Sequence, residues 1–114
     1  MNEYTMHVDI IGYSYTVIFT DDYEPFRKND GLFGETNYDT LTIYIRRSLC
    51  PVAMEKTVLH ELTHALLNVQ GGIMRREFDL ESLCEFVSWN SEYLVNKSHE
   101  IANEYVRNAD YANY

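Results

Sequence analysis

Cysteine, proline and glycine are scarce in this chain of 114 residues, which has two cysteines, two prolines and five glycines. These counts exclude a disulfide-dense scaffold and a disordered or fibrous chain rich in proline and glycine. Cys50 and Cys84 lie far apart and outside any Cys-x-x-Cys pair. We therefore expect both to be reduced, mostly buried thiols of an intracellular protein.

Basic residues are also few, nine against eighteen acidic ones, and the formal net charge is −9. This charge would repel phosphate backbones and anionic membranes, so we expect no nucleic-acid or membrane partner, and a basic protein partner if there is one. No stretch approaches the roughly 18 apolar residues of a membrane-spanning helix. The first nine residues also lack a basic start followed by an apolar run. The sequence thus favours a cytoplasmic protein.

The rest of the composition is that of a folded globular domain. Hydrophobic residues make up 46%, aromatic residues 14% and charged residues 24% of the chain, and this length accommodates one hydrophobic core. We therefore expect a single domain spanning residues 1–114. The ten tyrosines supply apolar area with a polar tip, which favours core and rim packing over a tyrosine-rich binding surface.

The first half of the sequence favours β-strands. Residues 4–11 and 13–20 are two runs of β-branched and aromatic side chains separated by a glycine, which is typical of a hairpin. Residues 21–30 are charged, contain a proline and indicate a loop. A second pair of strands is expected within residues 31–45, with its turn at residues 37–39.

The second half favours helices. One helix should begin at Pro51, where the missing N–H of proline is no loss, and run to about Gln70, before two glycines. Helical spacing of apolar residues predicts further helices over residues 79–96 and 99–111. The expected fold class is therefore α+β, in which a small antiparallel sheet of three or four strands packs on the first long helix and on one or two further helices.

The segment His60-Glu61-Leu62-Thr63-His64 is an H-E-x-x-H motif in the middle of the first long helix. At about 100° per residue, His60 and His64 stack one turn apart, so both imidazoles can reach a single metal ion. Apolar side chains collect on the opposite side of this helix: Val58, Leu62, Ala65, Leu66 and Val69. Because shuffling the composition gives the pattern only about once in a hundred sequences, we favour a zinc site over a chance match.

A catalytic zinc site needs a third protein ligand and an open position. The candidates are the acids after the paired glycines, chiefly Glu81 and Glu85, which are four residues apart. One carboxylate can bind the metal while the other, a turn away, accepts the outer N–H of a ligand histidine. We expect Glu81 to be the ligand and Glu85 to support a histidine; Glu77 and Asp79 are weaker substitutes, and a solvated helix face is the alternative for each acid.

The motif, followed by Glu81-x-x-Cys84-Glu85-x-Val87-Ser88, resembles the gluzincin metallopeptidases, especially the minimal ImmA/IrrE-like and related phage-encoded proteins. The resemblance covers about residues 31–97. It implies a minimal zincin-like fold, in which a glutamate on the next helix completes the zinc site, and it supports the order Glu81 then Glu85. It also implies that an edge strand of the sheet pairs with an extended peptide, and residues 41–45 occupy the expected place of that strand.

These residues predict a hydrolase with one Zn²⁺ ion and Glu61 as general base. Zinc lowers the pKa of water and polarises a substrate carbonyl, while Glu61 moves the proton from water to the leaving amine. By residue type, four side chains are candidates for stabilising the oxyanion, although each is better suited to packing or to the surface: Tyr38, Tyr93, Tyr105 and His99. Arg46 and Arg47 are equally weak candidates for gripping a substrate carboxylate.

Three hypotheses about function follow. The first is a zinc peptidase that cleaves a specific protein target, such as a regulator in a phage or mobile element. The second is a non-catalytic acidic metal-binding protein that binds and inhibits a basic partner; the presence of Glu61 argues against it, because a structural zinc needs no base. The third is a metal-free α+β domain with a chance motif. Neither the substrate nor the oligomeric state follows from the sequence.

Overall fold

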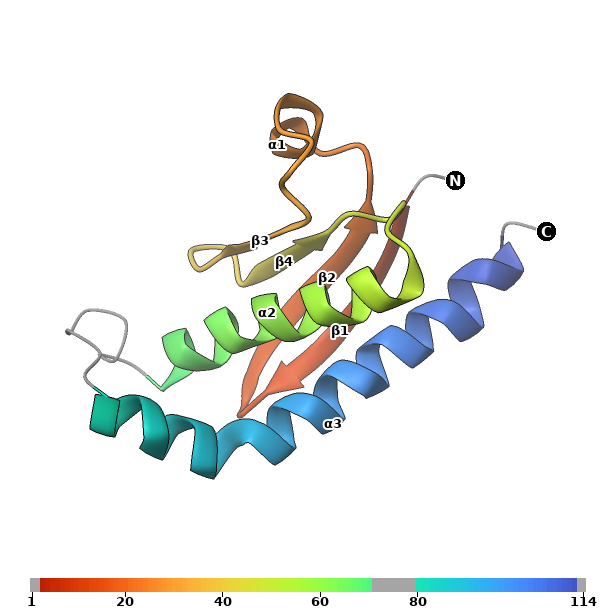
Figure 1. The fold of residues 1–114 in the computed structure, drawn as a ribbon. Coiled ribbons are helices and arrows are strands. Elements are labelled where there is room, and N and C mark those ends of the chain that lie inside the picture. Colours follow the sequence, from red (N-terminus) through yellow and green to blue (C-terminus); the bar gives the residue numbers. More distant parts are fainter. Residues whose placement is uncertain (1–2, 71–79, 113–114) are drawn as a thin grey trace.

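The computed structural model describes residues 3–70 and 80–112, with side chains described up to residue 108. A four-stranded sheet in the N-terminal half is followed by two long helices that pack against it (Figure 1). In chain order the elements are β1 (Glu3–Ile10), β2 (Tyr13–Thr20), α1 (Glu24–Lys28), β3 (Gly34–Asn37), β4 (Thr42–Ile45), α2 (Pro51–Val69) and α3 (Leu80–Ala112). Within the described ranges, neither long helix has the apolar stretch needed to cross a membrane.

The strand order is β1-β2-β4-β3. The β1–β2 and β3–β4 pairs are antiparallel, as the two predicted hairpins require, but β2 and β4 pair in parallel. The sheet is therefore mixed, and the prediction of an antiparallel sheet was wrong for its central pair. The reason is that the connection through α1 lets the second hairpin dock with β4, and not β3, beside β2.

The first hairpin turns at Ile11 and Gly12, whose φ angles are 49° and 86°. Two successive residues with positive φ make the tight two-residue turn that suits the twist of a hairpin, and glycine adopts this conformation without steric cost. The side-chain carboxylate of Asp9 also accepts a hydrogen bond from the backbone N–H of Gly12 at 3.3 Å. The glycine that separates the two runs in the sequence is thus the local cause of the predicted hairpin.

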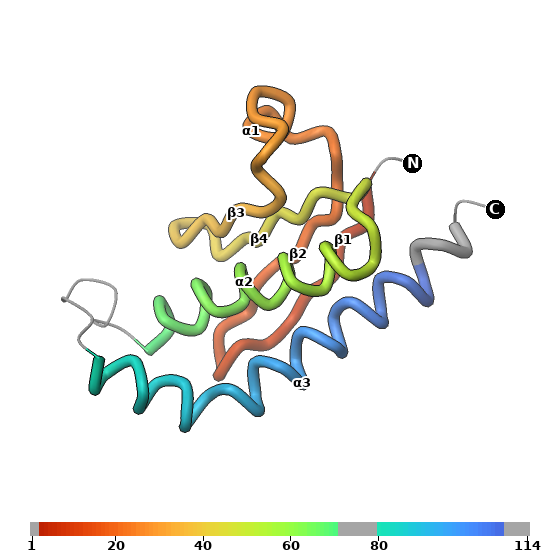
Figure 2. The backbone as a smooth tube through the Cα atoms, viewed as in Figure 1, coloured from red at the N-terminus to blue at the C-terminus, as the bar shows by residue number. Residues whose placement is uncertain are grey.

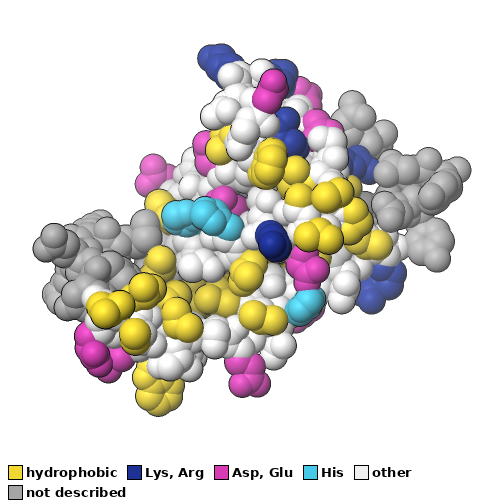
Figure 3. Space-filling view, viewed as in Figure 1, with side chains coloured by type: hydrophobic (Ala, Val, Ile, Leu, Met, Phe, Trp, Pro, Cys, Tyr) yellow, Lys and Arg dark blue, Asp and Glu magenta, His cyan; other side chains and the backbone are white. Residues whose placement is uncertain are grey.

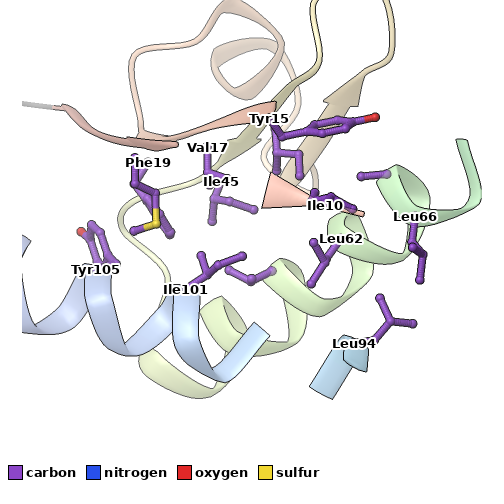
Figure 4. Packing of buried hydrophobic residues seen from close by; sticks show 14 of the residues in the cluster. Ile10, Tyr15, Val17, Phe19, Ile45, Leu62, Leu66, Leu94, Ile101 and Tyr105 are labelled. Carbon is purple, nitrogen blue, oxygen red and sulfur yellow. The ribbon is translucent and has the colours of Figure 1, made fainter. Parts of the chain in front are cut away.

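One face of the sheet forms the core with the two helices. Alternate residues of β2, namely Tyr15, Val17 and Phe19, are at most 1% exposed and point toward the helices, as period-two side chains of a strand do. Figure 4 shows them meeting Leu62 and Leu66 of α2 and three residues of α3: Leu94, Ile101 and Tyr105. The tube view shows α2 and α3 running side by side across this face (Figure 2).

Helix α2 begins at Pro51 and ends at Val69, as predicted. The two helices predicted after it are instead one continuous helix, α3. Ser98 directly precedes the second predicted range, residues 99–111, and serine is a preferred residue at a helix N-cap. In the structure it is 2% exposed inside α3, and its hydroxyl donates to the carbonyl of Val95 at 2.9 Å. A serine that bonds one turn back in this way is accommodated within a helix, so its capping preference does not end the helix.

Three predictions of burial and contact need correction. Cys50 and Cys84 are exposed, not buried. Leu83 and Val87, two of the apolar residues whose helical spacing predicted the helix over residues 79–96, are 47% and 51% exposed, whereas Phe86 between them is buried. Arg46, a candidate for gripping a substrate carboxylate, donates instead through its guanidinium to backbone carbonyls of the chain, those of Phe26 in α1 and of Asn29 and Leu32 between α1 and β3.

Candidate active site

Helix α2 brings the two motif histidines together. The ring centroids of His60 and His64 lie 5.0 Å apart, with ring planes inclined at 69°. Zn–N bonds of about 2.0–2.1 Å at a roughly tetrahedral angle place two ligand imidazole centroids about 5 Å apart, so the observed spacing fits a shared zinc ion. The His60 side chain is 67% exposed, and the space-filling view shows adjoining histidine side chains on one face of the molecule (Figure 3).

Glu61, between the histidines in sequence, is buried despite its carboxylate, with 5% of its surface exposed. The hydroxyl of Thr36 on β3 donates to Glu61 Oε1 at 2.7 Å. The other oxygen, Oε2, lies 4.0 Å from His60 Nε2. One oxygen is therefore held by the sheet while the other remains on the histidine side, which suits a base that must take a proton beside the histidines.

Gly34 of β3 makes this arrangement possible, because it lets the strand lie directly on α2. A Cβ at Gly34 would be 2.8 Å from both Glu61 Cγ and Thr57 Cγ2, and 3.1 Å from Glu61 Oε2. The edge strand next to the histidines is therefore β3. The prediction that residues 41–45 form the edge was wrong, since β4 is paired on both sides.

We expect Gly34→Ala to destabilise the protein by about 2 kcal/mol, because the added methyl group must displace either β3 or the packed side chains of α2. Gly31→Ala is the matched control, since a Cβ there meets only Asn29 Oδ1, at 3.4 Å. Urea denaturation of both variants measures the difference. Equal stabilities for the two variants would mean that β3 does not rest on Glu61 as described.

Tyr38, in the turn between β3 and β4, reaches one of the motif histidines. Its hydroxyl lies 3.2 Å from His64 Nδ1. Burial, followed by the negative charge of Glu61, raises the pKa of the Tyr38 phenol, so it stays protonated at neutral pH. If the Nδ1–H of His64 donates to this oxygen, the lone pair of Nε2 is left for a metal. The sequence had identified Tyr38 by residue type alone.

We expect Tyr38→Phe to weaken zinc binding about tenfold while leaving the fold intact, because partners that orient ligand histidines typically contribute this much to metal affinity. Competition with a chelating dye measures the zinc dissociation constant. Tyr13→Phe is the control, because Tyr13 is 50% exposed on β2. An unchanged zinc dissociation constant in Tyr38→Phe would mean that Tyr38 does not support metal binding.

The third zinc ligand remains a prediction. Glu81 and Glu85 lie exposed in the first turns of α3, and Glu77 and Asp79 fall outside the described residues. Among the side chains that the structure describes, in residues 3–70 and 80–108, the histidines, cysteines, aspartates and glutamates form no group of three that could hold a metal. The described structure therefore brings together two of the predicted ligands and the predicted base, but not Glu81 or Glu85 with them.

The other candidates for the oxyanion lie elsewhere. His99 pairs with Glu55, the hydroxyl of Tyr93 donates to the carbonyl of Asp9 at 3.5 Å, and Tyr105 in the core accepts a hydrogen bond from Arg47. Sequence reasoning missed Gly34 and Thr36. Their spacing of two residues places them on one face of a strand, but that signal becomes informative only once β3 is known to pass over Glu61.

A cavity of about 470 Å³ opens beside the motif, and its lining includes both His60 and Glu61. Phe33 comes from the segment leading into β3, Gly34 from β3 itself, and Lys56 from the first half of α2. The candidate base thus lies at the edge of a space large enough for part of a substrate.

Comparison with protein-family models, curated proteins and solved structures finds no match to this chain.

Proposed function

We propose that this protein is a zinc-dependent metallohydrolase of the minimal zincin type, a peptidase that cleaves a specific protein target. The observation that carries the proposal is the placement of Glu61. A buried carboxylate with one oxygen held by Thr36 and the other facing His60 is positioned for proton transfer, whereas a purely structural zinc site needs no such group.

His60 and His64 would hold the zinc ion, with Glu81 as the proposed third ligand. When bound, the ion supplies Lewis-acid polarisation of the substrate carbonyl and lowers the pKa of water at the site. In this protein the Oε2 atom of Glu61 would take a proton from that water and later return it to the leaving amine. Thr36 keeps the carboxylate oriented through both transfers, because it bonds the oxygen that does not carry the proton.

Tyr38 has a second use in this arrangement. Its phenol remains protonated at neutral pH and lies beside the histidines. A neutral O–H at this position can orient His64, and it can also donate to an oxyanion that develops during attack on a carbonyl. The zinc-affinity measurement on Tyr38→Phe tests the first of these roles separately from catalysis.

The proposal is tested by incubating the purified protein with a peptide library derived from a whole proteome and identifying new termini by mass spectrometry. A library of this breadth is needed because a protein with one specific target can be inactive on generic substrates. We expect new termini with a shared sequence pattern, their loss after zinc is removed with a chelator, and their return when zinc is restored. Identical termini in the zinc-loaded and chelated samples would contradict the proposal.

A further inference from the structure

The cavity beside Glu61 combines an apolar wall with a single cation. Leu32 and Phe33 before β3 and Ala53 on α2 contribute apolar side chains to its lining, and Lys56, one turn after Ala53 on α2, contributes the cation. Phe33 is 43% exposed, so a large apolar side chain is presented to the open space next to the candidate base. A concave, mostly apolar space with a few placed polar or charged groups, here Lys56 in addition to His60 and Glu61 of the motif, is the usual form of a binding site.

Lys56 lies on the same face of α2 as His60 and His64, where its ammonium group can bind an anion. It precedes His60 by four residues on α2, so the side chains of residues 56, 60 and 64 follow one another on the same helix face. The other lysines and most arginines that the structure describes are already paired: Arg27, Lys28 and Lys97 with carboxylates, and Arg46 and Arg47 with oxygen atoms of the chain. In the described ranges, Lys56 has no carboxylate within ion-pair distance.

The spacing along α2 sets the position of the anion. The rise of about 1.5 Å per helical residue separates Lys56 from His60 and Glu61 by roughly 6–7.5 Å along the axis of α2. An extended peptide covers that length in about two residues. A carboxylate bound by Lys56 therefore belongs to a residue about two positions from the peptide bond that lies beside Glu61.

We propose that this cavity is a substrate subsite that takes a large apolar side chain, with Lys56 binding a carboxylate on one of the next two residues of the same peptide. The inference rests on the proposed function in that the peptide passes Glu61, but it concerns binding and not cleavage. The net charge of −9 opposes long acidic segments, so the site fits one carboxylate, either an acidic side chain or the free C-terminus of a peptide.

The test measures peptide binding by NMR titration of zinc-loaded protein carrying Glu61→Gln, which prevents turnover during the measurement. Four acetylated and amidated six-residue peptides combine Phe or Ala at one position with Glu or Gln at the next. We expect the Phe peptides to bind about tenfold more tightly than the Ala peptides, because a hydrophobic pocket typically favours a larger apolar side chain over a smaller one by at least this factor. Glu should improve binding about fivefold over Gln, as a partly exposed ion pair does.

Three further variants separate the two parts of the subsite. Lys56→Met should abolish the preference for Glu and keep that for Phe, whereas Ala53→Leu, which narrows the cavity, should do the reverse. Arg107→Met changes the net charge equally at an exposed residue that does not line the cavity, and should change neither preference. A fifth peptide identifies the source of the carboxylate. It has Phe followed by Gln, and the Gln is its last residue and carries a free C-terminal carboxylate. If this peptide binds as tightly as the Phe–Glu peptide, the subsite is assigned to a C-terminus.

The inference is overturned if wild-type affinity is the same for Phe and Ala, or if the preference for Glu survives in Lys56→Met. Its failure is distinguishable from failure of the proposed function. Preferential binding of the Phe and Glu peptides without any zinc-dependent cleavage would support the subsite and contradict the peptidase activity. Zinc-dependent cleavage without either binding preference would support the peptidase activity and contradict the subsite.

Discussion

His64→Ala is expected to reduce the zinc content of the purified protein from near one ion per chain to near zero. His60 and His64 are the two metal-binding side chains that α2 holds together, with ring centroids 5.0 Å apart. Removing one of them leaves a single imidazole on the helix, and zinc held by so few protein ligands is lost during purification. Elemental mass spectrometry of wild type and variant, prepared identically, measures the change.

His7→Ala is the matched control for this experiment. His7 is an exposed residue of β1 whose Nδ1 atom lies 3.3 Å from the hydroxyl of Thr16, and its loss should leave the zinc content unchanged. Circular dichroism establishes that both variants are folded. If His64→Ala retains wild-type zinc, the metal lies elsewhere. If the wild type binds no zinc even after reconstitution, the hydrolase proposal fails. The alternative of a non-catalytic, metal-binding inhibitor of a basic partner then fails to bind its metal as well.

Glu61→Gln is expected to lower the rate of peptide cleavage by roughly 10²–10⁴-fold, the usual contribution of a general base, without loss of zinc. Glutamine has nearly the same shape, and its amide oxygen can still accept the hydrogen bond that Thr36 donates at 2.7 Å. What the amide lacks is the ability to take a proton beside His60. The rate is measured on the peptide that the wild type cleaves best in the library experiment.

Glu55→Gln makes the same chemical change on the same helix and serves as the control. Glu55 pairs with His99 at the α2–α3 contact, away from Thr36, so its replacement should leave the cleavage rate within about twofold of wild type, as expected of a surface substitution. An unchanged rate in Glu61→Gln would point to a contaminating peptidase. A loss of rate together with the loss of zinc would assign Glu61 a structural role.

The elements that the sequence predicted well are those whose cause is local. The hairpin follows from a glycine between two strand-forming runs, and α2 follows from Pro51, the helical spacing of its apolar residues and the glycines beyond it. Predictions that assumed a local signal would override packing were wrong. Ser98 did not end a helix, and the spacing of Leu83 and Val87 did not bury them, because Phe86 provides the contact between α3 and the core there.

The sequence alone determined the relation between His60 and His64, because residues four apart in a helix stack at a distance set by helix geometry. The tertiary structure decided what surrounds them. Thr36 and Tyr38 reach the motif from 25 and 26 residues away, and they do so because β4 pairs in parallel with β2 and leaves β3 at the edge, over Glu61. Strand order depends on hydrogen bonds between distant segments, which no local periodicity encodes.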